Sequence, residues 1–80
     1  MIDTNNLGRK IADARRRLGL TQGDLALRVG VTAQAVSKWE QGRSCPDIAI
    51  LDEIADALGI SLFELLGMDE NGDALRKHSS

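Results

Sequence analysis

The stretch that decides the fold is QGDLALRVGVTAQAVSKWEQ, residues 22–41. It holds two short amphipathic segments, and each follows a threonine of the kind that caps a helix, Thr21 and Thr32. Only Gly30-Val31 separates them, which is too short for antiparallel packing and favours a sharp crossing of two helices. Gly30 suits this turn because glycine adopts a positive φ without steric cost.

The apolar positions of this stretch predict how the two helices cross. Ala26 has the small side chain that a close approach of one helix to the other requires. The segment from Thr32 to Glu40 is expected to turn Val36 and Trp39 inward and to leave polar side chains on its outer face. The positions expected to fix the crossing angle are Leu25, Val29, Val31, Val36 and Trp39.

Capping residues and glycines predict three further helices. The first is expected at about 7–18 after Asn6, another at 48–58 after Asp47, and the last from Ser61 to Leu66. Ser61 and Glu64 have the spacing of a capping box. Leu7, Ile11, Ala14 and Leu18 mark the buried face of the first of these helices. No alternating pattern typical of a strand is present, so the sequence predicts a compact all-α domain of five helices.

Length and composition limit the classes of protein to consider. Eighty residues with 42% hydrophobic content suit one globular domain, expected over residues 1–68, with a polar tail or linker at 69–80. No apolar run reaches the roughly 20 residues that cross a membrane, and the N-terminus lacks the apolar core of a signal peptide. The single Cys45 cannot form an internal disulfide. A cytoplasmic protein is therefore expected.

Charge is distributed unevenly along the chain. Residues 1–44 carry eight basic and four acidic side chains, a net charge of +4, whereas residues 45–80 carry two basic and eight acidic ones, a net charge of −6. One face can therefore be positive although the whole chain has a net charge of −2.

These motifs together resemble the phage repressor and Cro type of helix-turn-helix domain, also called the XRE family. The resemblance runs from about residue 7 to residue 66, nearly the whole of the expected domain. It implies a lambda-repressor-like fold of five helices whose third helix enters the major groove of double-stranded DNA, usually as a homodimer. The residues that carry it are RLGLTQ (17–22), LA (25–26), VGVT (29–32), VSKWEQGR (36–43), Pro46, LGIS (58–61) and Leu65-Leu66.

The resemblance also implies roles for individual residues. Gln22 would bind a phosphate at the start of the second helix, and Gly42 and Arg43 would meet the DNA backbone. In the third helix Gln34 would read adenine, Lys38 guanine and Ala33 a thymine methyl group. Arg15 and Glu40 would form a structural ion pair. The full set of DNA-binding residues implied is Gln22, Thr32, Ala33, Gln34, Ser37, Lys38 and Arg43.

The sequence departs from the family pattern in two respects. Gly23 replaces a better helix former in the first turn of the second helix, at a cost of up to roughly 1 kcal/mol. Ala33 and Ala35 leave few polar side chains on the third helix, so part of the specificity is expected to come from DNA shape.

The leading hypothesis is a transcriptional regulator, a repressor that binds a pseudo-palindromic operator as a dimer. The alternatives are an antitoxin or other protein-interaction module that uses an apolar surface at Leu65, Leu66 and Met68, and the N-terminal DNA-binding part of a longer sensor-regulator. An enzyme is not expected, and neither is a cofactor or a metal site. His78 stands alone in the tail, and the acidic residues of the fourth helix have no nucleophile beside them.

Overall fold

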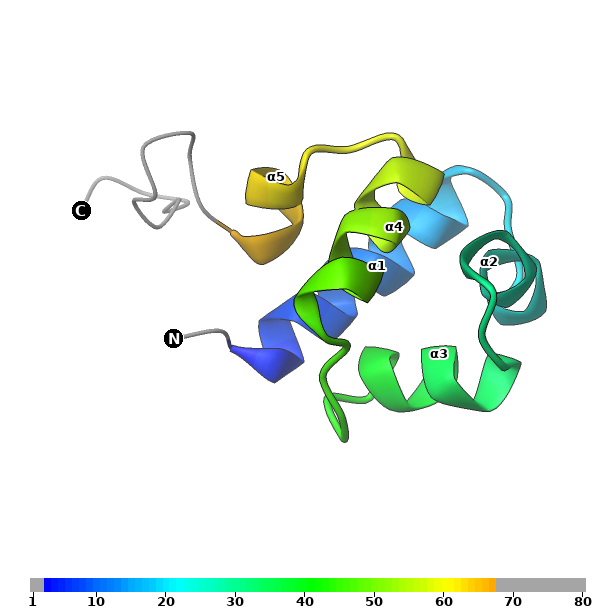
Figure 1. Ribbon diagram of the computed structural model, residues 1–80, viewed down its shortest axis with the longest axis horizontal. Coiled ribbons are helices and arrows are strands. Elements are labelled where there is room, and N and C mark those ends of the chain that lie inside the picture. Colours follow the sequence, from blue (N-terminus) through cyan, green and yellow to red (C-terminus); the bar gives the residue numbers. More distant parts are fainter. Residues whose placement is uncertain (1–2, 68–80) are drawn as a thin grey trace.

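A computed structural model describes residues 3–67, which form five helices and no strand (Figure 1). This confirms the predicted all-α architecture. The expected tail at 69–80 and Met68 lie outside the described residues. The helices are α1 (Thr4–Arg17), α2 (Gln22–Val29), α3 (Ala33–Glu40), α4 (Ile48–Leu58) and α5 (Leu62–Leu66).

Three of the predicted helix caps form as expected. The Thr21 hydroxyl accepts a hydrogen bond from the Asp24 N–H, and the Asp24 carboxylate accepts one from the Thr21 N–H, which completes a capping box at α2. The Thr32 hydroxyl accepts from Ala35 N–H at 3.1 Å at the start of α3. At α4, Asp47 accepts from Ile50 N–H at 2.9 Å. Short side chains therefore set where these helices begin.

Three local predictions were wrong. α1 begins at Thr4 because Asp3, not Asn6, caps it by accepting from the N–H groups of Asn5 and Asn6. Leu18 follows the last residue of α1 and is 51% exposed, so it is not part of the buried face. At α5 the Ser61 hydroxyl accepts from Glu64 N–H at 2.9 Å, but among the described residues the reciprocal half of that capping box is not formed.

α3 lies against α1 and α2, and α4 packs against α1, α2 and α5 (Figure 1). Val36 and Trp39 face inward, as predicted, and are 0% and 6% exposed. Of the described residues, no helix is long and apolar enough to cross a membrane. The rest of the core is aliphatic: Leu7, Ile11, Ala14, Leu25, Ala26, Val29, Leu51, Ile54, Ala55, Leu58 and Leu65.

Gly8 brings the backbones of α1 and α3 into direct contact. A Cβ atom at this position would meet the Trp39 carbonyl oxygen and would lie 2.8 Å from the carbonyl oxygen of Glu40. Any larger residue would push the last turn of α3 away from α1. Gly8 thus fixes how far α3 lies from the core, and with it the position of the outer face of α3.

Candidate nucleic-acid interface

The outer face of α3 is built from side chains that the core does not use. Ala33, Gln34 and Lys38 are exposed, and Thr32, which caps the helix, is exposed as well. Val36 and Trp39, on the opposite face, hold the helix against the core. α3 is therefore docked by one face and leaves the other for a ligand, which is the arrangement a recognition helix needs.

Two hydroxyl groups of this face already have hydrogen-bond partners. Thr32 Oγ1 accepts from the N–H of Ala35, so it caps α3. Ser37 is half-buried, and its Oγ accepts from Gln41 Nε2 at 2.8 Å. Each hydroxyl keeps its own proton for donation. Gln34 and Lys38 supply long exposed polar side chains on this face.

Gln41 belongs to the same surface, although the family resemblance implies no DNA contact for it. It is exposed and lies four residues after Ser37 and three after Lys38, and residues at these spacings share one side of a helix. The helical period alone was therefore sufficient to find it.

Two hydrogen bonds hold the first part of the loop after α3. Arg43 N–H donates to the Lys38 carbonyl at 2.9 Å, and the Thr4 hydroxyl donates to the Gly42 carbonyl at 3.5 Å. Gly42 has a φ of 75°, and a Cβ atom there would collide with the Asn5 side chain. The exposed Arg43 side chain is thus carried by a backbone of defined conformation, one turn beyond Lys38.

A cluster of three polar side chains joins the start of α2 to the end of α3. Arg15 and Glu40, the pair that the resemblance implies, are linked by Nε to Oε2 at 2.7 Å and by Nη2 to Oε1 at 2.9 Å. Arg15 Nη1 also donates to the Leu20 carbonyl at 2.8 Å. Gln22 Nε2 donates to Glu40 Oε1 at 3.0 Å. The ion pair therefore holds α1, the α1–α2 connection, α2 and α3 together.

The ionisation of this pair follows from its contacts. The hydrogen bond to Glu40 raises the pKa of Arg15, more than burial lowers it. Burial raises the pKa of Glu40, but the hydrogen bonds from Arg15 and Gln22 and the nearby arginine charges outweigh it, so that this pKa lies below its usual value. Both residues are charged at neutral pH.

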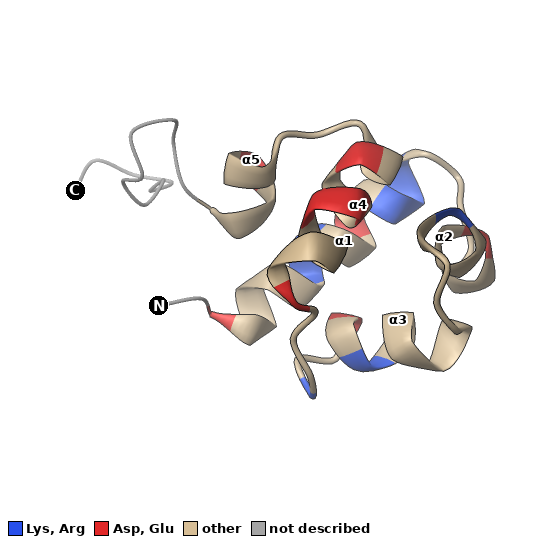
Figure 2. Ribbon diagram, viewed as in Figure 1, with Lys and Arg blue, Asp and Glu red and all other residues tan. Residues whose placement is uncertain are grey.

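The basic residues at α3 and the acidic residues on α4 lie on different parts of the domain. Figure 2 shows basic positions on α3 and in the loop after it, whereas acidic positions follow one another along α4. Asp52, Glu53 and Asp56 on α4 are exposed. The surface around α3 therefore suits a polyanion better than the surface of α4 does.

A family model described as helix-turn-helix matches residues 11–65. The chain belongs to this family. The match spans α2 and α3 and extends almost to the end of α5. Two curated relatives are named HTH-type transcriptional regulators, which agrees with the expectation that the chain is not an enzyme.

Similar proteins place this helix-turn-helix domain among regulators. It is 44% identical over 63 residues to an uncharacterised HTH-type transcriptional regulator of Methanothermobacter thermautotrophicus, covering 78% of this chain and 91% of that protein. It is 35% identical over 69 residues to the cryptic phage CTXphi transcriptional repressor RstR of Vibrio cholerae, covering 82% and 62% of the two chains. The P22 c2 repressor, solved in complex with a synthetic operator, is 33% identical with a TM-score of 0.75 over 79% of this chain and 96% of that one.

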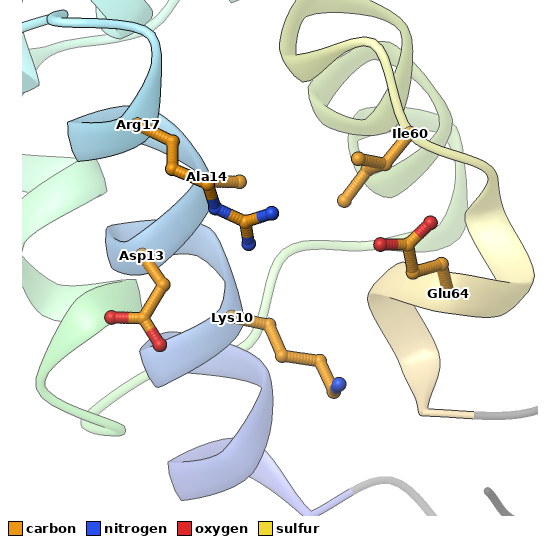
Figure 3. A pocket seen from close by; sticks show the side chains of 6 residues that line it. All are labelled: Lys10, Asp13, Ala14, Arg17, Ile60 and Glu64. Atoms are coloured by element: carbon orange, nitrogen blue, oxygen red, sulfur yellow. The ribbon is translucent and has the colours of Figure 1, made fainter.

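The helix-turn-helix domain also has a shallow hollow of about 110 Å³ between α1 and α5 (Figure 3). Arg17 and Glu64 extend toward it from opposite walls, and Ala14 and Ile60 also line it. None of its lining residues belongs to the DNA-binding set that the sequence indicated. The hollow is therefore separate from the α3 surface.

Proposed function

We propose that this helix-turn-helix domain represses transcription by binding an operator in double-stranded DNA, with α3 in the major groove. The observation that carries the proposal is the exposed outer face of α3, which the fold itself does not use. On it Gln34 pairs with adenine, Lys38 donates to guanine, and Ala33 touches a thymine methyl group. Thr32, Ser37 and Gln41 lie beside them and add hydrogen-bonding groups.

Contacts to the DNA backbone set the position of α3 in the groove. Gln22 binds one phosphate from the start of α2, and Arg43 binds another from the loop after α3. The acidic side chains of α4 would repel phosphates, and Figure 2 shows these acidic positions apart from the basic positions on α3 and in the loop after it. The repressor names of two similar proteins, RstR and P22 c2, support repression as the outcome of binding.

The protein binds as a dimer on a pseudo-palindromic site, with half-sites on the order of 34 Å apart. The surface predicted at the end of α5 needs one correction, because Leu65 is 0% exposed and belongs to the core. Phe63, 42% exposed, is the large apolar side chain that α5 offers to a second copy or another partner. Phe63→Glu should lower the mass of the DNA-bound species in sedimentation from two protein copies to one.

Two substitutions test the assignment of base and phosphate contacts. Gln34→Ala should lose about 1–3 kcal/mol of preference at one base-pair position. Arg43→Ala should weaken binding to all duplexes alike. It should also lower the slope of log Kd against the logarithm of the salt concentration by about one. Fluorescence anisotropy at several salt concentrations measures both quantities, with an operator selected from random duplexes and a scrambled one.

The matched control is Glu53→Gln, which removes one charge from the exposed surface of α4. It should leave base preference unchanged and affect affinity only weakly and uniformly. If Gln34→Ala and Arg43→Ala both bind operator and scrambled duplex as the parent does, the assigned surface does not bind DNA.

A further inference from the structure

Gln22 is anchored to an ion pair that is already complete without it. Arg15 gives Glu40 two hydrogen bonds, one to each carboxylate oxygen, at 2.7 and 2.9 Å. The side chains of Arg15 and Glu40 are 10% and 6% exposed. Gln22 Nε2 is a third donor, at 3.0 Å from Oε1. Holding a glutamine in one rotamer costs side-chain entropy, so its fixed position calls for a gain beyond the ion pair.

The geometry of a carboxamide suggests what that gain is. Gln22 has two N–H donors and one carbonyl acceptor in one plane. When Glu40 accepts one N–H, the directions of the second N–H and of the carbonyl oxygen are set as well. Gln22 is only half-buried, so its side chain is held by Glu40 and still reaches the surface of the domain.

We propose that Glu40 is a positioning residue for DNA binding, because it orients the Gln22 carboxamide so that its second N–H meets a backbone phosphate. This inference rests on the proposed function, in which Gln22 binds that phosphate. Glu40 belongs to α3, the helix that reads the bases, and Gln22 belongs to α2. Their hydrogen bond therefore fixes the phosphate contact relative to the base contacts before DNA arrives, which lowers the entropy lost on binding.

The test separates positioning from stability by replacing the ion pair with apolar residues. Buried ion pairs can often be exchanged for apolar side chains of similar size without loss of stability. The double variant Arg15→Met/Glu40→Leu should therefore fold and leave Gln22 without its anchor. Urea unfolding establishes that the variant is folded at the temperature of the binding assay.

Gln22→Ala is then made in the parent and in the apolar-pair variant, and the affinity for a selected operator is measured. Gln22→Ala removes a hydrogen bond to a charged phosphate. It should therefore weaken binding about tenfold in the parent. In the apolar-pair variant the same change should cost less than about twofold, and that variant alone should already have lost most of the tenfold. Gln34→Ala, at a site distant from the pair, serves as the control and should have an equal effect in both backgrounds.

An NMR measurement does not depend on how well the variant folds. In the parent without DNA, the two Nε2 protons of Gln22 should have clearly separated shifts, one of them typical of a hydrogen bond to a carboxylate. Addition of the operator should move the other proton. Nearly equal shifts in the parent, or movement of the Glu40-bonded proton alone, would overturn the proposal.

The binding results distinguish this proposal from the proposed function. If the parent binds no selected duplex, the proposed function fails. If the parent binds, but the folded apolar-pair variant binds equally well and Gln22→Ala costs the same in both backgrounds, Glu40 serves stability alone and the positioning role is wrong.

Discussion

The two faces of α3 follow different rules. The residues of the inner face make contacts within the fold, since Val36 and Trp39 are buried and Glu40 is hydrogen-bonded to α1 and α2. The outer face is exposed and carries the long polar side chains of Gln34 and Lys38, with Gln41 directly after the helix. The comparison teaches that docking and reading are separable in this helix. Changes of the apolar residues Val36 and Trp39 should cost stability, whereas changes of the outer face should cost DNA recognition at constant stability.

The largest effect is expected from Trp39→Ala. Removing a buried Trp side chain typically costs about 3–5 kcal/mol, because both burial and packing are lost. Urea unfolding followed by circular dichroism measures this loss. A change smaller than about 1 kcal/mol would mean that Trp39 does not hold α3 in place.

Two glycines test how α3 is seated against α1. Gly8→Ala should lower the unfolding free energy by roughly 1–3 kcal/mol, because its Cβ atom would collide with backbone carbonyls of α3. Gly23→Ala is the matched control, since the nearest atom to its Cβ is Thr21 Oγ1 at 3.7 Å. It should raise stability by up to ~1 kcal/mol through better helix propensity. Equal effects of the two substitutions would contradict the close contact of α1 and α3.

Acid should weaken the attachment of α3 to α1 and α2, because it protonates Glu40. Its pKa is lowered in the folded protein, so its stabilising effect is complete above the unfolded pKa of about 4.3 and disappears as pH falls through the lower folded value. Glu40→Gln should cost about 1–3 kcal/mol at neutral pH and make stability less dependent on pH below about 5. Melting temperatures across this range test it, and parallel curves for parent and variant would exclude Glu40 as a source of acid sensitivity.

The smallest effect on stability is expected from Gln34→Ala. Substitutions of exposed residues usually change the unfolding free energy by less than ~0.5 kcal/mol. The same protein should lose preference at one base-pair position. A large loss of stability would show that Gln34 takes part in docking, and the two faces would then not be separable.

The order and type of the helices were predictable because their signals are local. Caps such as Thr21, Thr32 and Asp47 act within one turn, and helical periodicity identifies the buried Val36 and Trp39. The start of α1 was not predictable, because Asp3 and Asn6 are both good caps and only the packed structure decides between them. Leu18 follows the helical spacing of α1, but the chain turns away after Arg17 and leaves it exposed.

The candidate site was predictable as a surface and not as a network. The residues of the outer face follow from the family resemblance and the helical period. The hydrogen bond from Gln22 to Glu40 joins residues of two helices and depends on the rotamers of both side chains. No local pattern specifies such a contact. The hydrogen bond depends on how α2 crosses α3 and on where Arg15 holds Glu40.

Selection of bound sequences from random duplexes tests the central claim most directly. The outer face of α3 predicts an enriched half-site, repeated with two-fold symmetry about one helical turn apart, at which Gln34→Ala relaxes a single position. A flat enrichment profile at moderate salt, for a folded protein, would contradict the assignment of α3 as a recognition helix.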